Sequence, residues 1–298
     1  MFGQVQTTAP RLILLEQESR ANPVLKKPSS TRSISFKKEK KQLKSVNAYS
    51  ALAVVYDMVM DHVDYEGWAD YILHLVETHS DKEDSTELHI LELGCGTGLF
   101  TSELLIQTKA FITAADSSSQ MLEWASKRFA ENKSRVACHQ LDFELGWEKF
   151  ALERKADVVI LLYDCINYIR SEEGIGRLFE GVKAQMKEDS VFIFDQSTPA
   201  NSINNAAYFE DEGEQDGISY TRKSAFDIKS KIHTTQFEIA TPEGVFHESH
   251  VQRAWTRSEI EAAIKSSGME LITSYDGFSL DPGHDDAERI HWVLRLAN

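Results

Sequence analysis

The sequence predicts a doubly wound α/β fold, in which helices cover both faces of a mainly parallel sheet. Three observations support this prediction. Apolar strand patterns alternate with amphipathic helix patterns from His89 to Ser197. The runs "VVILL" (158–162) and "VFIF" (191–194) are continuously apolar, which is typical of strands buried on both faces. A bare turn, "GCGTG" (94–98), directly follows the first of the apolar strands. Such an alternation is characteristic of a parallel sheet between helices.

The predicted elements follow in order along the chain. Helical spacing, broken around 62–65, predicts two helices over 49–79. Strands are then expected at 89–94, 111–116, 135–142, 157–164 and 190–197, with helices at 100–109, 119–133 and 173–187. Alternating polar and apolar residues at 218–239 and 246–255 indicate antiparallel strands. Thr256 and Glu259 form a capping box for a helix that Gly268 ends, and two last strands follow at 269–278 and 288–298.

Charge separates the start of the chain from the rest. Residues 1–45 contain ten Lys/Arg and three Glu, about +7, whereas the whole chain carries −15, so the remainder carries about −22. The basic segment is rich in Lys and Ser and predicts a mostly disordered tail, either a solubilising extension or a tether to an anionic surface. The acidic remainder repels polyphosphate at long range, which disfavours a nucleic-acid substrate.

Composition also narrows the setting of the protein. The three cysteines, at 95, 138 and 165, form no CxxC pair, which argues against a disulfide framework or a zinc site and favours a reducing compartment. No uncharged run reaches the roughly 18 residues of a membrane span, and "RLILL" (11–15) is too short for a signal-peptide core. We therefore expect a cytoplasmic protein without membrane attachment. The histidines are scattered, so no metal site is expected.

The glycine turn carries the first functional signal. Glycines at 94, 96 and 98 allow positive φ and let a ligand approach the backbone. A nicotinamide fingerprint would require glycine at 99, where this chain has leucine. The segment "LELGCGTG" (91–98) instead resembles the first motif of class I S-adenosylmethionine-dependent methyltransferases. The resemblance implies S-adenosyl-L-methionine as cofactor, with its methionine part against Gly94, Cys95, Gly96 and Gly98, and with Glu92 holding either the loop or the cofactor's amino end.

Two further segments of that family follow in the expected order. "AADSSSQML" (114–122) places Asp116 at the end of a strand, where two carboxylate oxygens suit both ribose hydroxyls. Ser117 and Gln120 fit a capping box, so Ser117 is expected to start the helix beside the cofactor. The resemblance implies that Met121 lies beside the adenine, although a methionine at helical spacing is also typical of a core. In "HQLDF" (139–143) it implies that Asp142 accepts from the adenine amino group, with Phe143 alongside, although an acid that ends a strand is also typical of a turn.

The fourth segment bears on the substrate. "YDCINYI" (163–169) follows the fourth strand and lacks the prolines of nucleobase amino-methyltransferases. It resembles small-molecule enzymes of the glycine or sugar-amine type. The resemblance implies Tyr163 and Asp164 beside the cofactor and Asn167 and Tyr168 around the reacting centre. The alternative is that Asn167 caps the next helix and Tyr168 packs in the core.

The resemblance also implies a division of the chain into four parts. These are the tail (1–45), a cofactor-binding core with its amino-terminal helices (46–200), a β-strand lid over the methyl site (201–255), and a return to the core (256–298) that completes a seven-stranded sheet with an antiparallel last strand. The segment "FDQSTP" (194–199) matches the family just before the lid. Substrate contacts are expected from Tyr56, Tyr65, Tyr168, Arg222 and Arg253. If a base is needed, His250 is the candidate, because imidazole takes up a proton near neutral pH.

Three functional hypotheses follow. The first is a methyltransferase acting on N or O of a small molecule. The second is a nucleic-acid or protein methyltransferase recruited by the basic tail, which the missing proline motif and the acidic body disfavour. The third is a non-catalytic, cofactor-binding regulatory protein on the same fold. The methylated atom, the acceptor and the oligomeric state are left open by the sequence.

Overall fold

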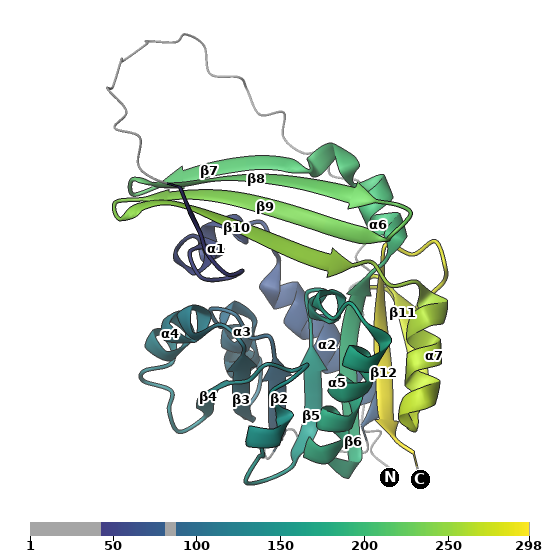
Figure 1. The fold of residues 1–298 in the computed structure, drawn as a ribbon. Coiled ribbons are helices and arrows are strands. Elements are labelled where there is room, and N and C mark those ends of the chain that lie inside the picture. The colour runs from purple at the N-terminus through teal and green to yellow at the C-terminus, as the bar shows by residue number, and fades with distance from the viewer. Residues whose placement is uncertain (1–42, 81–87, 298) are drawn as a thin grey trace, which may run out of the picture. The chain divides into compact units, whose positions relative to one another are not determined.

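A computed structural model describes residues 43–80 and 88–297 of the chain, which contain two β-sheets (Figure 1). The predicted basic tail lies outside the described residues, except for its last three positions. The larger sheet has seven strands in the order β11-β12-β6-β5-β2-β3-β4. Its strands are β2 (His89–Leu93), β3 (Phe111–Asp116), β4 (Val136–Gln140), β5 (Ala156–Leu161), β6 (Met186–Ser197), β11 (Met269–Asp276) and β12 (Arg289–Leu296).

The direction of the strands confirms the predicted fold class. Strands β2 to β6 pair in parallel, whereas β12 runs antiparallel to both β6 and β11. β12 lies between β6 and β11, so it is the single reversed strand of an otherwise parallel sheet, next to the edge strand β11. The prediction of a mostly parallel, seven-stranded sheet with an antiparallel last strand is therefore confirmed.

Helices cover both faces of this sheet. Alternate residues of β5 enter two separate hydrophobic clusters: Val159 and Leu161 one, Val158 and Ile160 the other. This division follows from the two-residue repeat of a strand. The first cluster packs under α5 (Glu172–Gln185) and α7 (Arg257–Ser267), and the second under α2 (Tyr65–His79), α3 (Leu99–Gln107) and α4 (Ser119–Arg128). A strand with all six residues buried needs this double cover, which explains its continuous apolar run.

The segment before α2 is less regular than predicted. In place of one long helix before the break, the structure has two short turns of helix, η1 (Leu52–Val54) and α1 (Tyr56–Val59), with α2 capped by the Asp64 carboxylate. The expected capping box at 117–120 is wrong by one residue. Ser118 is the N-cap of α4 and accepts from Met121 N, because the Asp116 carboxylate accepts from Ser118 N and turns the chain before the helix begins.

The second sheet has five strands in the order β1-β10-β9-β8-β7. They are β1 (Leu43–Ser45), β7 (Glu210–Gln215), β8 (Ile218–Asp227), β9 (Ile232–Thr241) and β10 (Gly244–Arg253). The four strands β7 to β10 are antiparallel, and β1 pairs in parallel with β10. The alternating pattern predicts this for β8, β9 and β10, whereas β7 was not predicted. The helical segments α6 (Pro199–Asn204) and η5 (Ala206–Tyr208) connect β6 to this sheet. Across the described parts of the chain, no helix is both long and apolar enough to cross a membrane.

The return to the core begins at a capping box that the structure confirms. The Thr256 side chain accepts from Glu259 N, the Glu259 carboxylate accepts from Thr256 N, and the helix ends at Gly268 with φ of 70°. Glu259 also accepts from Lys231 and Arg253, so the start of α7 is held to β10 and to the turn before β9.

Thr256→Ala should lower the free energy of unfolding by about 0.5–2 kcal/mol, because α7 loses the side-chain partner of its first turn. Urea unfolding followed by circular dichroism measures this change. Ser266→Ala, a loss of an exposed hydroxyl later in α7, serves as the control. Its effect should stay within about 0.5 kcal/mol, and equal losses for both variants would contradict the cap's role.

Candidate active site

The glycine turn lies between β2 and α3, at the carboxyl end of the central strands. All three of its glycines have positive φ: 73° at Gly94, 57° at Gly96 and 86° at Gly98. A Cβ at Gly94 would lie 2.7 Å from Cys165 Sγ, and one at Gly98 would lie 2.5 Å from the Phe129 ring. Both the backbone conformation and the close neighbours therefore require glycine at 94 and 98.

Asp116 holds this turn from the end of the neighbouring strand, β3. Its Oδ2 accepts from Gly96 N (2.9 Å) and its Oδ1 accepts from Ser118 N (2.8 Å). Burial raises the pKa of Asp116, and the backbone N–H groups only partly offset that effect. A carboxylate oxygen can accept twice. Each oxygen thus keeps a lone pair for a ligand hydroxyl while holding the backbone.

Glu92, on β2, is the second buried acid of the site. Its Oε2 accepts from Thr101 Oγ1 at 2.5 Å, and the side chain is almost fully buried. Burial raises the pKa of Glu92 to about 7. A carboxylate in this position is a binding site for a cation, because a neighbouring positive charge favours its ionised form.

These acids face a cavity of about 270 Å³. Most of the residues expected at the cofactor or the substrate line it: Tyr56, Tyr65, Glu92, Gly94, Cys95, Gly96, Asp116, Ser117, Met121, Asp142, Phe143, Tyr163 and Tyr168. Gly98 and Asp164, expected at the cofactor, do not line it. The cavity brings together the carboxyl ends of four adjacent strands, where a ligand of a doubly wound sheet binds.

Two wall residues carry both interpretations left open by the sequence. Met121 lines the cavity and is also buried within the first turn of α4, so it is both a core side chain and a cavity wall. Asp142 accepts from Glu144 N and Leu145 N through Oδ1, as a turn former does, while lining the same cavity. Their contacts with adenine stay predictions.

Other wall residues were missed by sequence reasoning: Ala48, Tyr49, Leu99, Phe100, Glu144, Cys165 and Ile169. Cys165 follows the fourth strand directly and could have been included with the segment 163–169. Tyr49 had no such signal, because it reaches the cavity only through φ of 61°, a conformation rare for tyrosine. Tyr163 and Asp164 share this left-handed backbone, with φ of 58° and 50°. Such positive φ values outside glycine tend to gather at functional sites.

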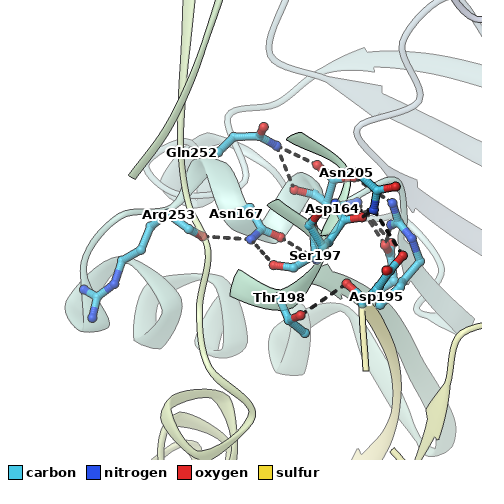
Figure 2. A network of polar contacts seen from close by, with 11 residues as sticks. Asp164, Asn167, Asp195, Ser197, Thr198, Asn205, Gln252 and Arg253 are labelled. Atoms are coloured by element: carbon cyan, nitrogen blue, oxygen red, sulfur yellow. Dashed lines mark hydrogen bonds and ion pairs between the residues drawn. The ribbon is translucent and has the colours of Figure 1, made fainter. Parts of the chain in front are cut away.

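Figure 2 shows Asp164 and Asn167 within a network of polar contacts. Asp164 accepts from Gln252 Nε2 (2.7 Å) and Arg289 Nη2 (3.1 Å). Asn167 is buried, donates to Ser197 O (2.8 Å) and Arg253 O (2.7 Å), and accepts from Ser197 N. This amide joins η4 (Cys165–Tyr168) to β6 and β10, which fits a supporting role. Its place at the reacting centre stays a prediction.

The two arginines expected at the substrate lie outside the cavity wall. The Arg253 guanidinium stacks 3.6 Å from the centre of the Trp255 ring and donates to Glu259 Oε1. The Arg222 guanidinium lies 3.7 Å from the Asp211 carboxylate on the neighbouring strand. Both side chains stabilise the five-stranded sheet and its junction with α7, and their contact with substrate stays a prediction.

His250 is connected to the cavity through Tyr168. Its Nδ1 lies 3.0 Å from Tyr168 OH, which lies 2.6 Å from Tyr49 OH, and both tyrosines line the cavity. On its other side, His250 Nε2 lies 3.2 Å from the Glu248 carboxylate, which is fully buried. The candidate base is thus one hydroxyl away from the cavity wall. Among the described residues, no group of three or more His, Cys, Asp or Glu side chains is placed to hold a metal ion.

Comparison with known proteins identifies the part of the chain that builds this site. A family model described as "Methyltransferase domain" matches residues 90–189, which run from β2 into the first residues of β6. Residues 90–189 thus match the methyltransferase-domain family, and the chain has the fold of an S-adenosylmethionine-dependent methyltransferase. This confirms the resemblance inferred from the sequence, and with it the cofactor, because this family of methyltransferase domains uses S-adenosylmethionine.

The chain is similar over most of its length to proteins of known sequence or structure. The Bacillus subtilis (strain 168) protein "Putative methyltransferase YqeM" is 27% identical over 231 residues, 75% of this chain and 87% of that protein. A crystal structure of an S-adenosylmethionine-dependent methyltransferase from Clostridium acetobutylicum ATCC 824 aligns with a TM-score of 0.67 at 24% identity, covering 85% of this chain and all of that one (100%). The sugar N-methyltransferase KedS8 from Streptoalloteichus sp. ATCC 53650 aligns with a TM-score of 0.60 at 18% identity, covering 91% and 100%.

The raised pKa of Glu92 makes the stability of the protein depend on pH. The folded value is about 7 and the ordinary value is 4.5, so unfolding releases a proton between these limits and stability falls as pH rises through them. Glu92→Gln imitates the protonated side chain. Its free energy of unfolding should exceed that of the intact protein by about 3 kcal/mol above pH 7 and should approach it near pH 4.5.

Urea unfolding at a series of pH values between 5 and 8.5 measures this difference. Glu131→Gln, at an exposed position, is the control for loss of one negative charge. A constant difference between Glu92→Gln and the intact protein across that range would show that Glu92 is ionised throughout.

Proposed function

We propose that the protein transfers a methyl group from S-adenosyl-L-methionine to a nitrogen or oxygen atom of a small molecule. The observation that carries this proposal is the wall of the cavity. It contains two buried acids, Glu92 and Asp116, together with tyrosines of the amino-terminal segment and of η4. One cavity thus offers polar groups for a cofactor and an aromatic enclosure for an acceptor.

The acids fit the cofactor that the domain family uses. Thr101 donates to Oε2 of Glu92, which leaves Oε1 to accept from a ligand. Burial disfavours the charged carboxylate, and a cation such as an amino-acid ammonium beside it would stabilise that charge. Asp116 offers two oxygens side by side for a vicinal diol. Among the residues that the structure describes, none is a hydrogen-bond partner of the buried Tyr163 hydroxyl, and Tyr163 lines the same cavity. We assign the ammonium to Glu92, the ribose to Asp116 and the adenine to the wall at Asp142 and Phe143.

The cofactor, when bound, supplies an activated methyl group on a sulfonium. The protein must then hold the acceptor in line with that methyl group and exclude water. Four tyrosines besides Tyr163 line the cavity: Tyr49, Tyr56, Tyr65 and Tyr168. Burial raises the pKa of each of them, so their hydroxyls stay neutral and act as hydrogen-bonding groups at neutral pH. Their rings provide the apolar, water-excluding part of the wall.

A small acceptor suits this site better than a polymer. The cavity is bounded by the amino-terminal segment, whose Tyr49 and Ala51 backbone N–H groups are bound to Glu248 of β10. The segment also contacts the core, because Ser118 Oγ donates to Tyr49 O and Thr97 Oγ1 donates to the Asp57 carboxylate. An acceptor must fit beneath these contacts. Solved neighbours with the same fold include enzymes that methylate amino sugars, which supports a small acceptor. We place the reaction in the cytoplasm, since the three cysteines are free.

Calorimetric titration with S-adenosylmethionine and S-adenosylhomocysteine tests the cofactor site first. Asp116→Ala should weaken binding at least about tenfold, because two hydrogen bonds to a charged group contribute roughly 1.5–3 kcal/mol each. Glu123→Ala, an exposed acid on the following helix, is the matched control and should bind as the intact protein does. A folded protein that binds neither compound would overturn the proposal.

Acceptor identity is tested by transfer of labelled methyl from S-adenosylmethionine into fractionated small molecules. Binding without transfer into any small-molecule fraction would leave the regulatory hypothesis. Label recovered in protein or nucleic acid, and lost when residues 1–42 are removed, would establish the tail-recruited alternative.

A further inference from the structure

A chain of hydrogen bonds runs from the cavity wall to a buried carboxylate. It passes from Tyr49 OH to Tyr168 OH (2.6 Å), to His250 Nδ1 (3.0 Å), and from His250 Nε2 to Glu248 Oε2 (3.2 Å). Tyr49 precedes Glu248 and His250 by about 200 residues in the sequence, and Tyr168 lies between these two segments. Glu248 and His250 are two residues apart on β10, so their side chains lie on the same face of the strand, and both are buried.

The state of the Glu248 carboxylate follows from its donors. Oε1 accepts from Ala51 N and from Leu52 N (2.9 Å), while Oε2 accepts from Tyr49 N (2.9 Å) and faces His250 Nε2. Three backbone N–H groups thus occupy three of the roughly four acceptor positions of an ionised carboxylate. The last position faces His250, so the imidazole nitrogen there must carry the hydrogen. Glu248 is therefore an acceptor only.

This assignment sets the direction of every hydrogen bond in the chain. A neutral imidazole has one N–H, so with the hydrogen on Nε2 the Nδ1 of His250 accepts from Tyr168. Tyr168 has then used its hydrogen and must accept that of Tyr49. The Tyr49 oxygen keeps lone pairs and has no second hydrogen. At the cavity wall, Tyr49 thus presents an acceptor for an N–H or O–H group and no donor.

The same chain can carry a proton away from the cavity. Burial raises the pKa of both Tyr49 and Tyr168, so neither side chain holds a negative charge at neutral pH. His250 is next to the Glu248 carboxylate, and a nearby negative charge stabilises an imidazolium. A proton that enters at Tyr49 would therefore leave both hydroxyls neutral and place its charge on His250.

We propose that Tyr49 takes up the proton that the methyl acceptor loses, and that Tyr168, His250 and Glu248 transmit and stabilise it; this inference rests on the proposed function. The N–H or O–H bond of the acceptor breaks, and its electron pair remains on the acceptor atom. That atom forms the new bond to the methyl carbon while the bond from this carbon to the sulfonium sulfur breaks, with its electron pair staying on the sulfur. The hydrogen passes to Tyr49, that of Tyr49 to Tyr168, and that of Tyr168 to Nδ1 of His250. The positive charge lost from the sulfonium is matched by the imidazolium.

The proposal narrows the class of acceptor. A hydroxyl, or an amine that arrives as an ammonium, must give up a proton, and either can donate to the Tyr49 oxygen. A carboxylate has no hydrogen to donate, and its oxygens would meet an acceptor without a donor. The structure therefore favours an acceptor that carries O–H or N–H over a carboxylic acid.

The first test needs no substrate. Nitrogen-15 NMR of the intact, histidine-labelled protein distinguishes the two imidazole nitrogens, and His250→Gln assigns the signal. We expect neutral His250 at pH 7.5, protonated on Nε2, with an Nδ1 shift that changes in Tyr168→Phe and not in Tyr208→Phe. Tyr208 is exposed and lies outside the cavity wall, so it is the matched control. Hydrogen on Nδ1, or a doubly protonated ring, would overturn the proposal.

The second test measures turnover with the acceptor found by methyl labelling. Tyr49→Phe and Tyr168→Phe should lower kcat by about 10²–10⁴, the range for a positioned acid or base, while KM and S-adenosylmethionine binding change by no more than about threefold. Tyr208→Phe should match the intact enzyme. Unchanged kcat in both cavity variants, or preferential methylation of carboxylic acids, would overturn the relay while leaving the methyltransferase proposal intact. Loss of cofactor binding by the intact protein would refute the proposed function instead.

Discussion

The carboxylate of Asp116 is the interaction on which the cofactor side of the site depends. It ends β3, accepts from the backbone of the glycine turn and from the residue that caps α4. Two loops that leave adjacent strands are therefore joined through one side chain, and the cavity opens between them. Because the carboxylate is buried, its charge is costly unless those N–H groups are present. The backbone conformation of the turn and the ionisation of Asp116 support each other.

Glu248 has a similar structural role at the part of the cavity wall that Tyr49 and Tyr168 form. Its backbone donors come from the segment just before α1, so the acid binds that segment against the five-stranded sheet. Tyr49 lies between these contacts and Ser118 of the core, which accounts for its left-handed backbone. The amino-terminal segment is thus bound both to the five-stranded sheet and to the core beside the cavity.

The features of the cavity that suit a ligand lower the stability of the fold. Glu92 and Asp116 both have raised pKa values, and three residues beside the cavity have positive φ without being glycine. Each of these features destabilises the unliganded fold, and the double-covered sheet beneath offsets them. By contrast, the ion pairs around Asp164 and Glu259 have all partners within the protein. This difference separates groups that await a ligand from groups that hold the scaffold.

The sequence by itself determined the fold class and most of the cavity wall. Continuous apolar runs require a sheet covered on both faces, and residues that end parallel strands must gather at one edge, so Glu92, Gly94, Gly96, Asp116 and Asp142 could be predicted without coordinates. The helix cap at Thr256 has an equally local cause. Only the tertiary structure decided which residues form the part of the wall around Tyr49. Tyr49 and Glu248 meet across about 200 residues through a backbone conformation that no local pattern encodes. For the same reason the structure, and not the motif, showed that Asn167 and Arg253 use their polar atoms inside the protein while Tyr168 faces the cavity.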